Sequence, residues 1–150
     1  MTGRRDPVIH FELPAKDMER ARAFYERAFG WQTTPLGAEM GNFTLAFTTQ
    51  TDEKSRMPTK RGAINGGFYE RTKPDDQVKL TILVKDVHAA MKRVHAAGGK
   101  VLGGSQGNGE PDEIPDVGSF ANVLDPEGNL VTLYEDRSPD PTPGQRALME

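Results

Sequence analysis

Cysteine is missing from the 150 residues of this chain. Its absence excludes disulfide bonds, thiolate nucleophiles and every zinc or iron–sulfur site that needs cysteine ligands. Any bound metal ion would have to use histidine, aspartate or glutamate. Long apolar runs are missing too, since no stretch approaches the roughly 18 residues that a membrane-spanning helix requires. Residues 1–11 also lack the apolar segment of a secretion signal, so we expect a cytoplasmic protein that does not bind membranes.

Positive charge is not in excess either. The chain carries 19 lysines and arginines against 22 aspartates and glutamates, a formal net charge of -3. Proteins that bind the phosphate backbone of nucleic acids need a basic surface, so we do not expect a nucleic-acid partner. The length is that of one domain.

The first 30 residues have the pattern of a strand followed by a helix. Residues 8–13 alternate apolar and polar side chains, which is typical of a strand with one face on a core. Residues 18–29 carry apolar side chains at helical spacing, with Asp17 placed to cap the start and Gly30 to end the helix. The apolar positions, expected to face the core, are Met18, Ala21, Phe24, Tyr25, Ala28 and Phe29.

The same pattern returns in the second half of the chain. Residues 80–84 alternate again, Asp86 is placed to cap a second helix, and Gly98 and Gly99 end it. Asp17 and Asp86 lie 69 positions apart, and several other residues obey the same shift. This repeat suggests a duplicated module, although any two strand–helix units share some likeness.

Shorter strands are expected around the two helices, in residues 32–35, 42–48, 63–70, 120–124 and 130–135. The last two strands flank the turn sequence DPEGN and predict a hairpin. Residues 49–61 and 103–116 lack periodicity and are expected to be loops. The polar ends, residues 1–6 and 137–150, are expected to be flexible.

Three segments resemble one protein family. IHFELPAKDMERARAFYERAFGW, VKDVHAAMKRVHAAGGKV and FANVLDPEGNLVTLYE are similar to segments of the vicinal-oxygen-chelate superfamily, which contains glyoxalases, bleomycin-resistance proteins and extradiol dioxygenases. The resemblance implies an α+β fold of two βαβββ modules, which form a curved mixed half-barrel sheet with the helices outside. It covers a single domain, residues 7–136, with half-repeats at about 7–73 and 76–136. Function does not follow, because this fold serves isomerases, dioxygenases, transferases and drug-sequestering proteins.

The resemblance also implies four metal-ligand positions. His10 matches the first, whereas the other three positions hold Gly67, Lys79 and Thr132. A catalytic transition-metal site usually has at least three protein ligands, so we expect no metal cofactor at the usual place. The alternative is a site with displaced ligands, in which Glu12 joins His10 and distant carboxylates complete the set. Glu70 or Glu135 would be such a carboxylate, although alternation turns Glu135 with Leu133 toward the helix side, which is typical of a strand-end surface charge.

The strand alternation itself predicts a polar face opposite the helices. The residues expected to face the helices are Ile9, Phe11, Leu13, Leu80, Ile82, Val84, Val131 and Leu133. We expect the polar face to hold a small-molecule ligand, although a sheet face turned to solvent would have the same composition. His10 and Glu12 are the candidates for catalysis, and Glu12 could instead pair with Lys79. The candidate ligand-binding residues are His10, Glu12, Lys79, Thr81, Thr132 and Tyr134.

Two further groups have a functional and a structural interpretation. Phe68, Trp31 and Phe120 could form aromatic walls of a cavity, or they could be core and interface residues. The basic residues of the loop at 49–61 could cover the cleft and attract anions, or they could simply be solvated. These basic residues are Lys54, Arg56, Lys60 and Arg61.

Three functions remain open at this stage. The first is a metal-independent small-molecule binder related to bleomycin-resistance proteins. The second is a metal-dependent lyase or dioxygenase of the glyoxalase kind with displaced ligands, and the third is a regulatory or interaction module without catalysis. Open βαβββ modules leave unpaired sheet edges that a second copy can cover, so we expect a homodimer.

Overall fold

The computed structural model describes residues 4–139 of the chain. They form two compact units. The N-terminal unit is made of residues 10–78, and the C-terminal unit is made of the described residues up to Ile9 and from Lys79 onward. Within residues 4–139, no helix is long and apolar enough to cross a membrane.

The predicted flexible ends lie partly outside the described residues. Where they are described, they form ion pairs with other residues of the C-terminal unit. The carboxylate of Asp6 lies 3.5 Å from the guanidinium of Arg93, and Arg137 pairs with Glu135 and Glu113. The flexibility of the two ends stays a prediction.

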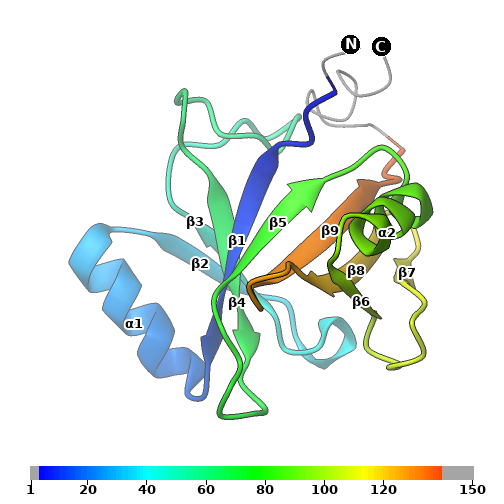
Figure 1. The fold of residues 1–150 in the computed structure, drawn as a ribbon. Coiled ribbons are helices and arrows are strands. Elements are labelled where there is room, and N and C mark those ends of the chain that lie inside the picture. The colour runs from blue at the N-terminus through cyan, green and yellow to red at the C-terminus, as the bar shows by residue number, and fades with distance from the viewer. Residues whose placement is uncertain (1–3, 140–150) are drawn as a thin grey trace. The chain divides into compact units, whose positions relative to one another are not determined.

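The N-terminal unit has the order strand, helix, three strands (Figure 1). Its sheet has the order β2-β3-β4-β1, in which β1 and β4 are parallel and the other neighbours antiparallel. The elements are β1 (Val8–Ala15), α1 (Met18–Phe29), β2 (Gln32–Pro35), the short 3-10 helix η1 (Ala38–Met40), β3 (Thr44–Phe47) and β4 (Asn65–Glu70).

Helix α1 begins and ends where the sequence predicts. The carboxylate of Asp17 accepts a hydrogen bond from the backbone N–H of Arg20 at 3.0 Å, which satisfies one of the free donors of the first turn. Gly30 ends the helix in the left-handed conformation with φ of 72°, and its N–H donates to the carbonyl of Glu26.

The core of the N-terminal unit lies between α1 and one face of its sheet. Ala15, Ala46 and Phe68 are buried there, and Met18, Ala21 and Tyr25 of α1 pack against them. The apolar residues Phe24 and Phe29 were predicted on this face, but they are 56% and 63% exposed. The stripe that α1 turns to the sheet is centred on residues 18, 21 and 25, so residues 24 and 29 fall outside it.

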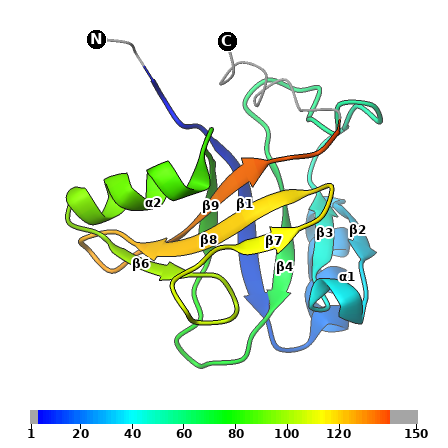
Figure 2. The same cartoon turned by 90° about the vertical axis from the view of Figure 1, so that its right-hand side faces the viewer.

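The C-terminal unit repeats the arrangement with one strand more. Its sheet has the order β5-β9-β8-β6 with β7 paired to β8, and Figure 2 shows α2 lying along β8 and β9. Strand β5 is parallel to β9, and the other pairs are antiparallel. The elements are β5 (Lys79–Leu83), α2 (Val87–Ala96), β6 (Lys100–Gly103), β7 (Asp112–Ile114), β8 (Gly118–Leu124) and β9 (Leu130–Asp136).

Strands β6 and β7 were not predicted, and β7 lies inside the expected loop 103–116. Both are too short to show an alternating pattern, since β7 has three residues and β6 has four. They form because β8 offers its backbone on both sides, to β9 on one side and to β6 and β7 on the other.

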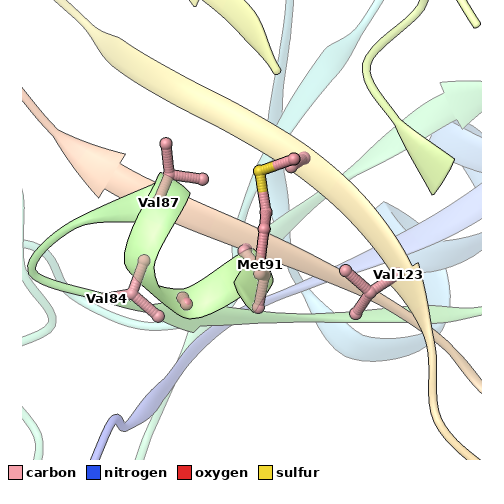
Figure 3. Packing of buried hydrophobic residues seen from close by; sticks show 7 residues of the cluster. Val84, Val87, Met91 and Val123 are labelled. Carbon is pink, nitrogen blue, oxygen red and sulfur yellow. The ribbon is translucent and has the colours of Figure 1, made fainter. Parts of the chain in front are cut away.

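Helix α2 covers the core of the C-terminal unit. Val87 and Met91 of the helix pack with Val84 and Val123 in a cluster of buried apolar side chains (Figure 3). Leu133 belongs to the same cluster, and Ile82 and Val131 pack against it, so the predicted inward face of β5 and β9 is confirmed for these residues. Leu80, predicted on the same face, is 45% exposed because this cluster does not reach it.

Candidate functional site

A cleft of about 890 Å³ opens on the N-terminal unit. Gln32 and Thr34 come from β2, Leu45 and Phe47 come from β3, and the loop that follows β3 supplies residues 48–53 and Arg56. The size falls in the range of small-molecule sites, which combine an apolar surface with a few fixed polar groups. Leu45 and Phe47 are the apolar part here.

Strand alternation explains why these side chains face the cleft. Gln32 pairs with Phe47, and Thr34 pairs with Leu45, so all four lie on one face of the β2–β3 hairpin. The residues between them point to α1 instead. The hydroxyl of Thr33, for example, accepts a hydrogen bond from Arg22 at 2.8 Å and donates one to Glu26 at 2.6 Å. The cleft therefore lies on the face opposite the helix.

The loop over the cleft is fixed to β4 by one amide side chain. Asn65 is 7% exposed; its Oδ1 accepts from the backbone N–H of Thr48 at 2.9 Å, and its Nδ2 donates to the hydroxyl of Thr51 at 2.7 Å. The hydroxyl of Thr48 donates to the carbonyl of Ile64 at 2.6 Å. Both ends of segment 48–51 are thus held by β4.

Asp52 shapes the next turn of this loop. Its carboxylate accepts hydrogen bonds from the backbone N–H groups of Ser55 at 2.7 Å and Lys54 at 2.9 Å. The bonds to Ser55 and Lys54 hold the pKa of Asp52 below its ordinary value, so the carboxylate is ionised near neutral pH.

The predicted catalytic candidates lie on β1, beside β4. His10 is opposite Asn65 in the parallel register, and Glu12 is opposite Gly67. They share the polar face of the N-terminal unit, but neither lines the cleft. Burial lowers the pKa of His10, against the smaller opposing effect of the Glu12 charge, so its imidazole is neutral at pH 7. In that state one ring nitrogen can accept a proton or a hydrogen bond.

This pKa predicts how stability depends on pH. The unfolded chain binds a proton at His10 more readily than the folded chain, between the lowered value and about 6.5. The His10 contribution to folding is therefore complete above pH 6.5 and is lost as the pH falls toward the folded-state pKa. Urea unfolding between pH 5 and pH 8 should show this loss in the native protein and a smaller one in His10→Gln. Equal slopes in both proteins would contradict the assignment.

Gly67, at the second of the family's ligand positions, is enclosed by its own unit. A Cβ atom at this position would lie 2.2 Å from Cζ of Phe43 and 2.6 Å from the carbonyl oxygen of Thr44. Phe43 therefore occupies the space in which a glutamate ligand would have to begin. A Cβ atom at Gly66 would likewise collide with Phe11 on the other face of the strand, 2.5 Å from its carbonyl oxygen.

The candidate residues of the C-terminal unit form a row across three strands. Thr81 of β5 is opposite Thr132 of β9, and Thr132 is opposite Asn122 of β8. Thr81 and Thr132 are 4% and 5% exposed, and the hydroxyl of Thr132 donates to Oδ1 of Asn122 at 2.9 Å. Lys79 is the first residue of β5 and lies two residues before Thr81, so the two belong to the same face of the strand. This row lies on the face away from α2.

Tyr134 extends the row with an aromatic pair. Its ring stacks on Phe120 with centroids 4.6 Å apart, and its hydroxyl donates to the carbonyl of Val117 at 2.9 Å. Burial, with the nearby Asp136 carboxylate, raises the pKa of the phenol, so it stays protonated. Phe120 thus lies on the face where the sequence predicted an aromatic wall.

The other two predicted walls, Phe68 and Trp31, belong to the core side of the N-terminal unit. Phe68 is 1% exposed between α1 and the sheet, and Trp31 stacks on Tyr25 with centroids 4.6 Å apart. Phe68 alternates with Gly67 and Tyr69 along β4, which turns it to α1. The core interpretation is the correct one for both residues.

Glu135, predicted as a strand-end surface charge, has a structural task. Its carboxylate accepts from the backbone N–H of Val87 at 2.9 Å and pairs with Arg137. It therefore satisfies a free donor at the start of α2 and is not available as a displaced metal ligand. Glu70 is exposed at the end of β4.

The residues at the family's metal positions do not fit a divalent ion. Gly67 has no donor, Lys79 is a cation, and the hydroxyl of Thr132 is already bonded to Asn122. Throughout residues 4–139, no three side chains of histidine, aspartate or glutamate are gathered as a metal site requires. We therefore derive no chemical step through a metal.

Sequence reasoning missed Asn122 and the cleft-lining residues of β2 and β3. Strand alternation could have identified Asn122, because Phe120, Asn122 and Leu124 alternate along β8 with the buried residues Ala121 and Val123. On β2 and β3 the strands have only four residues each, and the helix-facing side could be recognised only once Thr33 was seen bonded to α1.

Comparison with known proteins agrees with this architecture. The family model described as a glyoxalase-like domain matches residues 9–134. No curated protein matches the sequence.

Solved structures show the same fold at low sequence identity. A methylmalonyl-CoA epimerase in complex with methylmalonyl-CoA and NH4+ is 18% identical with a TM-score of 0.62, covering 92% of this chain and 99% of its own. A hypothetical protein from Bacillus halodurans C-125 is 13% identical with a TM-score of 0.61, covering 90% and 97%. A glyoxalase/bleomycin resistance protein/dioxygenase superfamily member from Vibrio splendidus 12B01 is 15% identical with a TM-score of 0.56, covering 88% and 100%.

These matches confirm the predicted α+β fold of two strand–helix–strand modules with mixed sheets. Likeness at this level of identity concerns the fold and not the reaction. Because the family model spans most of the chain, the protein belongs to the glyoxalase-like domain family.

Proposed function

We propose that this protein binds a small organic molecule in the cleft of the N-terminal unit, and that it does so without a divalent metal ion. The observation that carries the proposal is the composition of the cleft. An apolar surface from Leu45 and Phe47 lies beside amide and hydroxyl groups from Gln32, Thr34 and the loop at 48–51. Such a combination favours a ligand with an apolar body and a few hydrogen-bonding groups.

The residues predicted from the sequence enter the proposal as separate candidate ligand-binding groups, on the polar face of each unit and outside the cleft lining. His10 and Glu12 lie beside Asn65 and Gly67 in the N-terminal unit, where neutral His10 would serve as a hydrogen-bond or proton acceptor. The polar face of the C-terminal unit carries Lys79 and Thr81 of β5 and Thr132 and Tyr134 of β9. Each set lies on the sheet face opposite its helix.

Nuclear magnetic resonance can test this function directly. Protein labelled with ¹⁵N, purified without a His-tag and kept in EDTA, would be titrated with a panel of small aromatic and aliphatic molecules. Methylmalonyl-CoA belongs in the panel, because the epimerase of the same fold was solved with it. We expect saturable shifts of the amides of residues 45–56 with at least one compound.

Two outcomes would favour the other functions. Binding that appears only after Ni²⁺, Zn²⁺, Mn²⁺ or Fe²⁺ is added, with near-stoichiometric metal in the purified protein, would favour the metal-dependent lyase or dioxygenase. A complete lack of binding across the panel would favour the interaction module. Either result contradicts the proposal.

Asn65→Leu should weaken both the loop and the binding. The substitution removes the hydrogen bonds to Thr48 and Thr51 and leaves a backbone N–H without its partner, so we expect a loss of about 2 kcal/mol in the free energy of unfolding. Urea denaturation measures this loss. Thr59→Val, which removes one exposed hydrogen bond in the same loop, is the control and should cost less than about 0.5 kcal/mol. Equal effects would show that Asn65 does not hold the loop.

The homodimer remains part of the proposal. Strands β2 and β6 each have one partner strand within their own unit, and Phe24 and Phe29 of α1 are exposed. Both features are typical of surfaces that a second copy covers. Light scattering that finds only a 16.5 kDa species would contradict it. Cytoplasmic localisation likewise stays a prediction.

A further inference from the structure

Arg56, in the loop beside the cleft, has a backbone conformation that its residue type disfavours. Its φ is 63°, in the left-handed region. Within residues 4–139, the other two non-glycine residues with positive φ are Asn42 and Asp116, at 58° and 61°. Asparagine and aspartate adopt this region readily, whereas arginine has no short polar side chain to stabilise it locally.

The hydrogen bonds of the turn account for the left-handed backbone conformation at position 56, but they do not require an arginine there. The N–H of Arg56 donates to the carbonyl of Asp52 at 2.8 Å, and the N–H of Asp52 donates to the carbonyl of Met57 at 2.9 Å. The chain thus reverses between Thr51 and Pro58, which form a β-bridge. Glycine or asparagine would close this turn at lower cost. A strained residue beside a cleft is a reason to look for a function of its side chain.

The side chain of Arg56 lines the cleft and is exposed. Within the described part of the chain its guanidinium has no ion pair or hydrogen bond. The carboxylate of Asp52 is already bonded to the backbone of Lys54 and Ser55. The loop that carries Arg56 has four basic residues, Lys54, Arg56, Lys60 and Arg61, and two acidic residues, Asp52 and Glu53. Of these six, Asp52, Glu53 and Arg56 line the cleft, so Arg56 is the cation that the loop places there.

We infer that the ligand of this cleft is an organic anion, an apolar body with one carboxylate or phosphate group, and that Arg56 binds the anionic group. The inference rests on the proposed function and narrows its ligand class. A guanidinium presents two parallel N–H donors that match the two oxygens of a carboxylate or phosphate. Leu45 and Phe47 would contact the apolar body on the floor of the same cleft.

Three probes with the same phenyl body but different charge test the inference. 4-Phenylbutyrate carries a carboxylate, phenyl phosphate carries a phosphate, and 4-phenylbutanamide is neutral. Their dissociation constants would be measured from ¹⁵N amide shifts of residues 45–56 at fixed ionic strength. We expect at least one anion to bind about tenfold or more tightly than the amide, a typical gain for a charge-assisted pair. The anion that binds more tightly identifies the preferred group.

Two substitutions separate Arg56 from the general charge of the loop. Arg56→Asn should abolish the preference for the anion and should not lower the urea midpoint, because asparagine suits the left-handed conformation. Arg56→Gly should behave in the same way. Lys60→Gln removes the same charge from the loop outside the cleft lining and should keep the preference.

The outcomes distinguish the inference from the proposed function. Equal binding of amide and anions, or an anion preference that survives in Arg56→Asn, overturns the inference and leaves small-molecule binding intact. Binding of none of the three probes, together with a negative compound panel, overturns the proposed function and the inference with it.

Discussion

Replacing Phe68 with alanine should lower the free energy of unfolding by about 3 to 5 kcal/mol, the range found for large aromatic side chains removed from cores. Phe68 is 1% exposed and lies within 5.4 Å of the Tyr25 ring, centroid to centroid, and 6.4 Å of Trp31. Alanine would leave a cavity between α1 and β4 that these two rings could fill only by leaving their own positions. Urea or thermal unfolding followed by circular dichroism measures the loss.

Phe24→Ala is the matched control for this result. It removes the same side chain from the outer side of the same helix-and-sheet unit, where Phe24 is 56% exposed, and should cost less than about 1 kcal/mol. A similar loss in both variants would mean that Phe24 is covered in solution, as the homodimer proposal allows. A loss below about 1 kcal/mol in Phe68→Ala would contradict the position of Phe68 in the core.

Gly118→Ala should be the most damaging glycine substitution in the C-terminal unit. A Cβ atom there would lie 2.0 Å from the carbonyl oxygen of Glu135 and 2.7 Å from Cε1 of Tyr134, and φ is 151°. The carbonyl belongs to the neighbouring strand β9, so it can move away only if the β8–β9 pairing shifts. We expect a loss of about 3 kcal/mol or more, measured by urea unfolding.

Gly109→Ala shows how much of that loss comes from backbone conformation alone. Gly109 also has a positive φ, 79°, but no atom lies within 4 Å of the Cβ position. This variant should lose only about 1 kcal/mol. If both glycine variants lose the same amount, the close approach of β8 to β9 at Gly118 is not the cause.

The glycines matter for the candidate site because they allow neighbouring strands and side chains to pack directly against the backbone. The β8–β9 ladder that Gly118 permits also places Asn122 opposite Thr132 and Phe120 opposite Tyr134. In the N-terminal unit, Gly66 and Gly67 likewise let Phe11 and Phe43 lie directly on β4, beside Asn65. The polar faces of both units therefore depend on glycines that contribute no chemistry themselves.

Local patterns predicted the larger elements well. The helix at 18–29 follows from a short-range rule, because Asp17 and Gly30 satisfy groups within four residues of themselves. The strand alternation of Ile82, Val84 and Leu133 gave the correct core face in the same way. The family match confirms a glyoxalase-like domain, as the resemblance of three segments implied, and the solved structures confirm the α+β fold.

Other features depend on residues far apart in the chain, and there the sequence was insufficient. Strands β6 and β7 exist because β8 pairs with them, and the outward position of Phe24 and Phe29 depends on which stripe of α1 meets the sheet. The cleft needs the loop after β3 to be tied back to β4 by Asn65.

By itself, then, the sequence determined the order of the main helices and strands, the lack of cysteine chemistry, and the residues Gly67, Lys79 and Thr132 at three of the four metal-ligand positions that the resemblance implies. Only the tertiary structure decided which polar face carries a cleft, that Arg56 lines this cleft and that Asn65 holds its loop. The reason is physical: caps and alternation act over a few residues, whereas a cleft forms where distant segments pack.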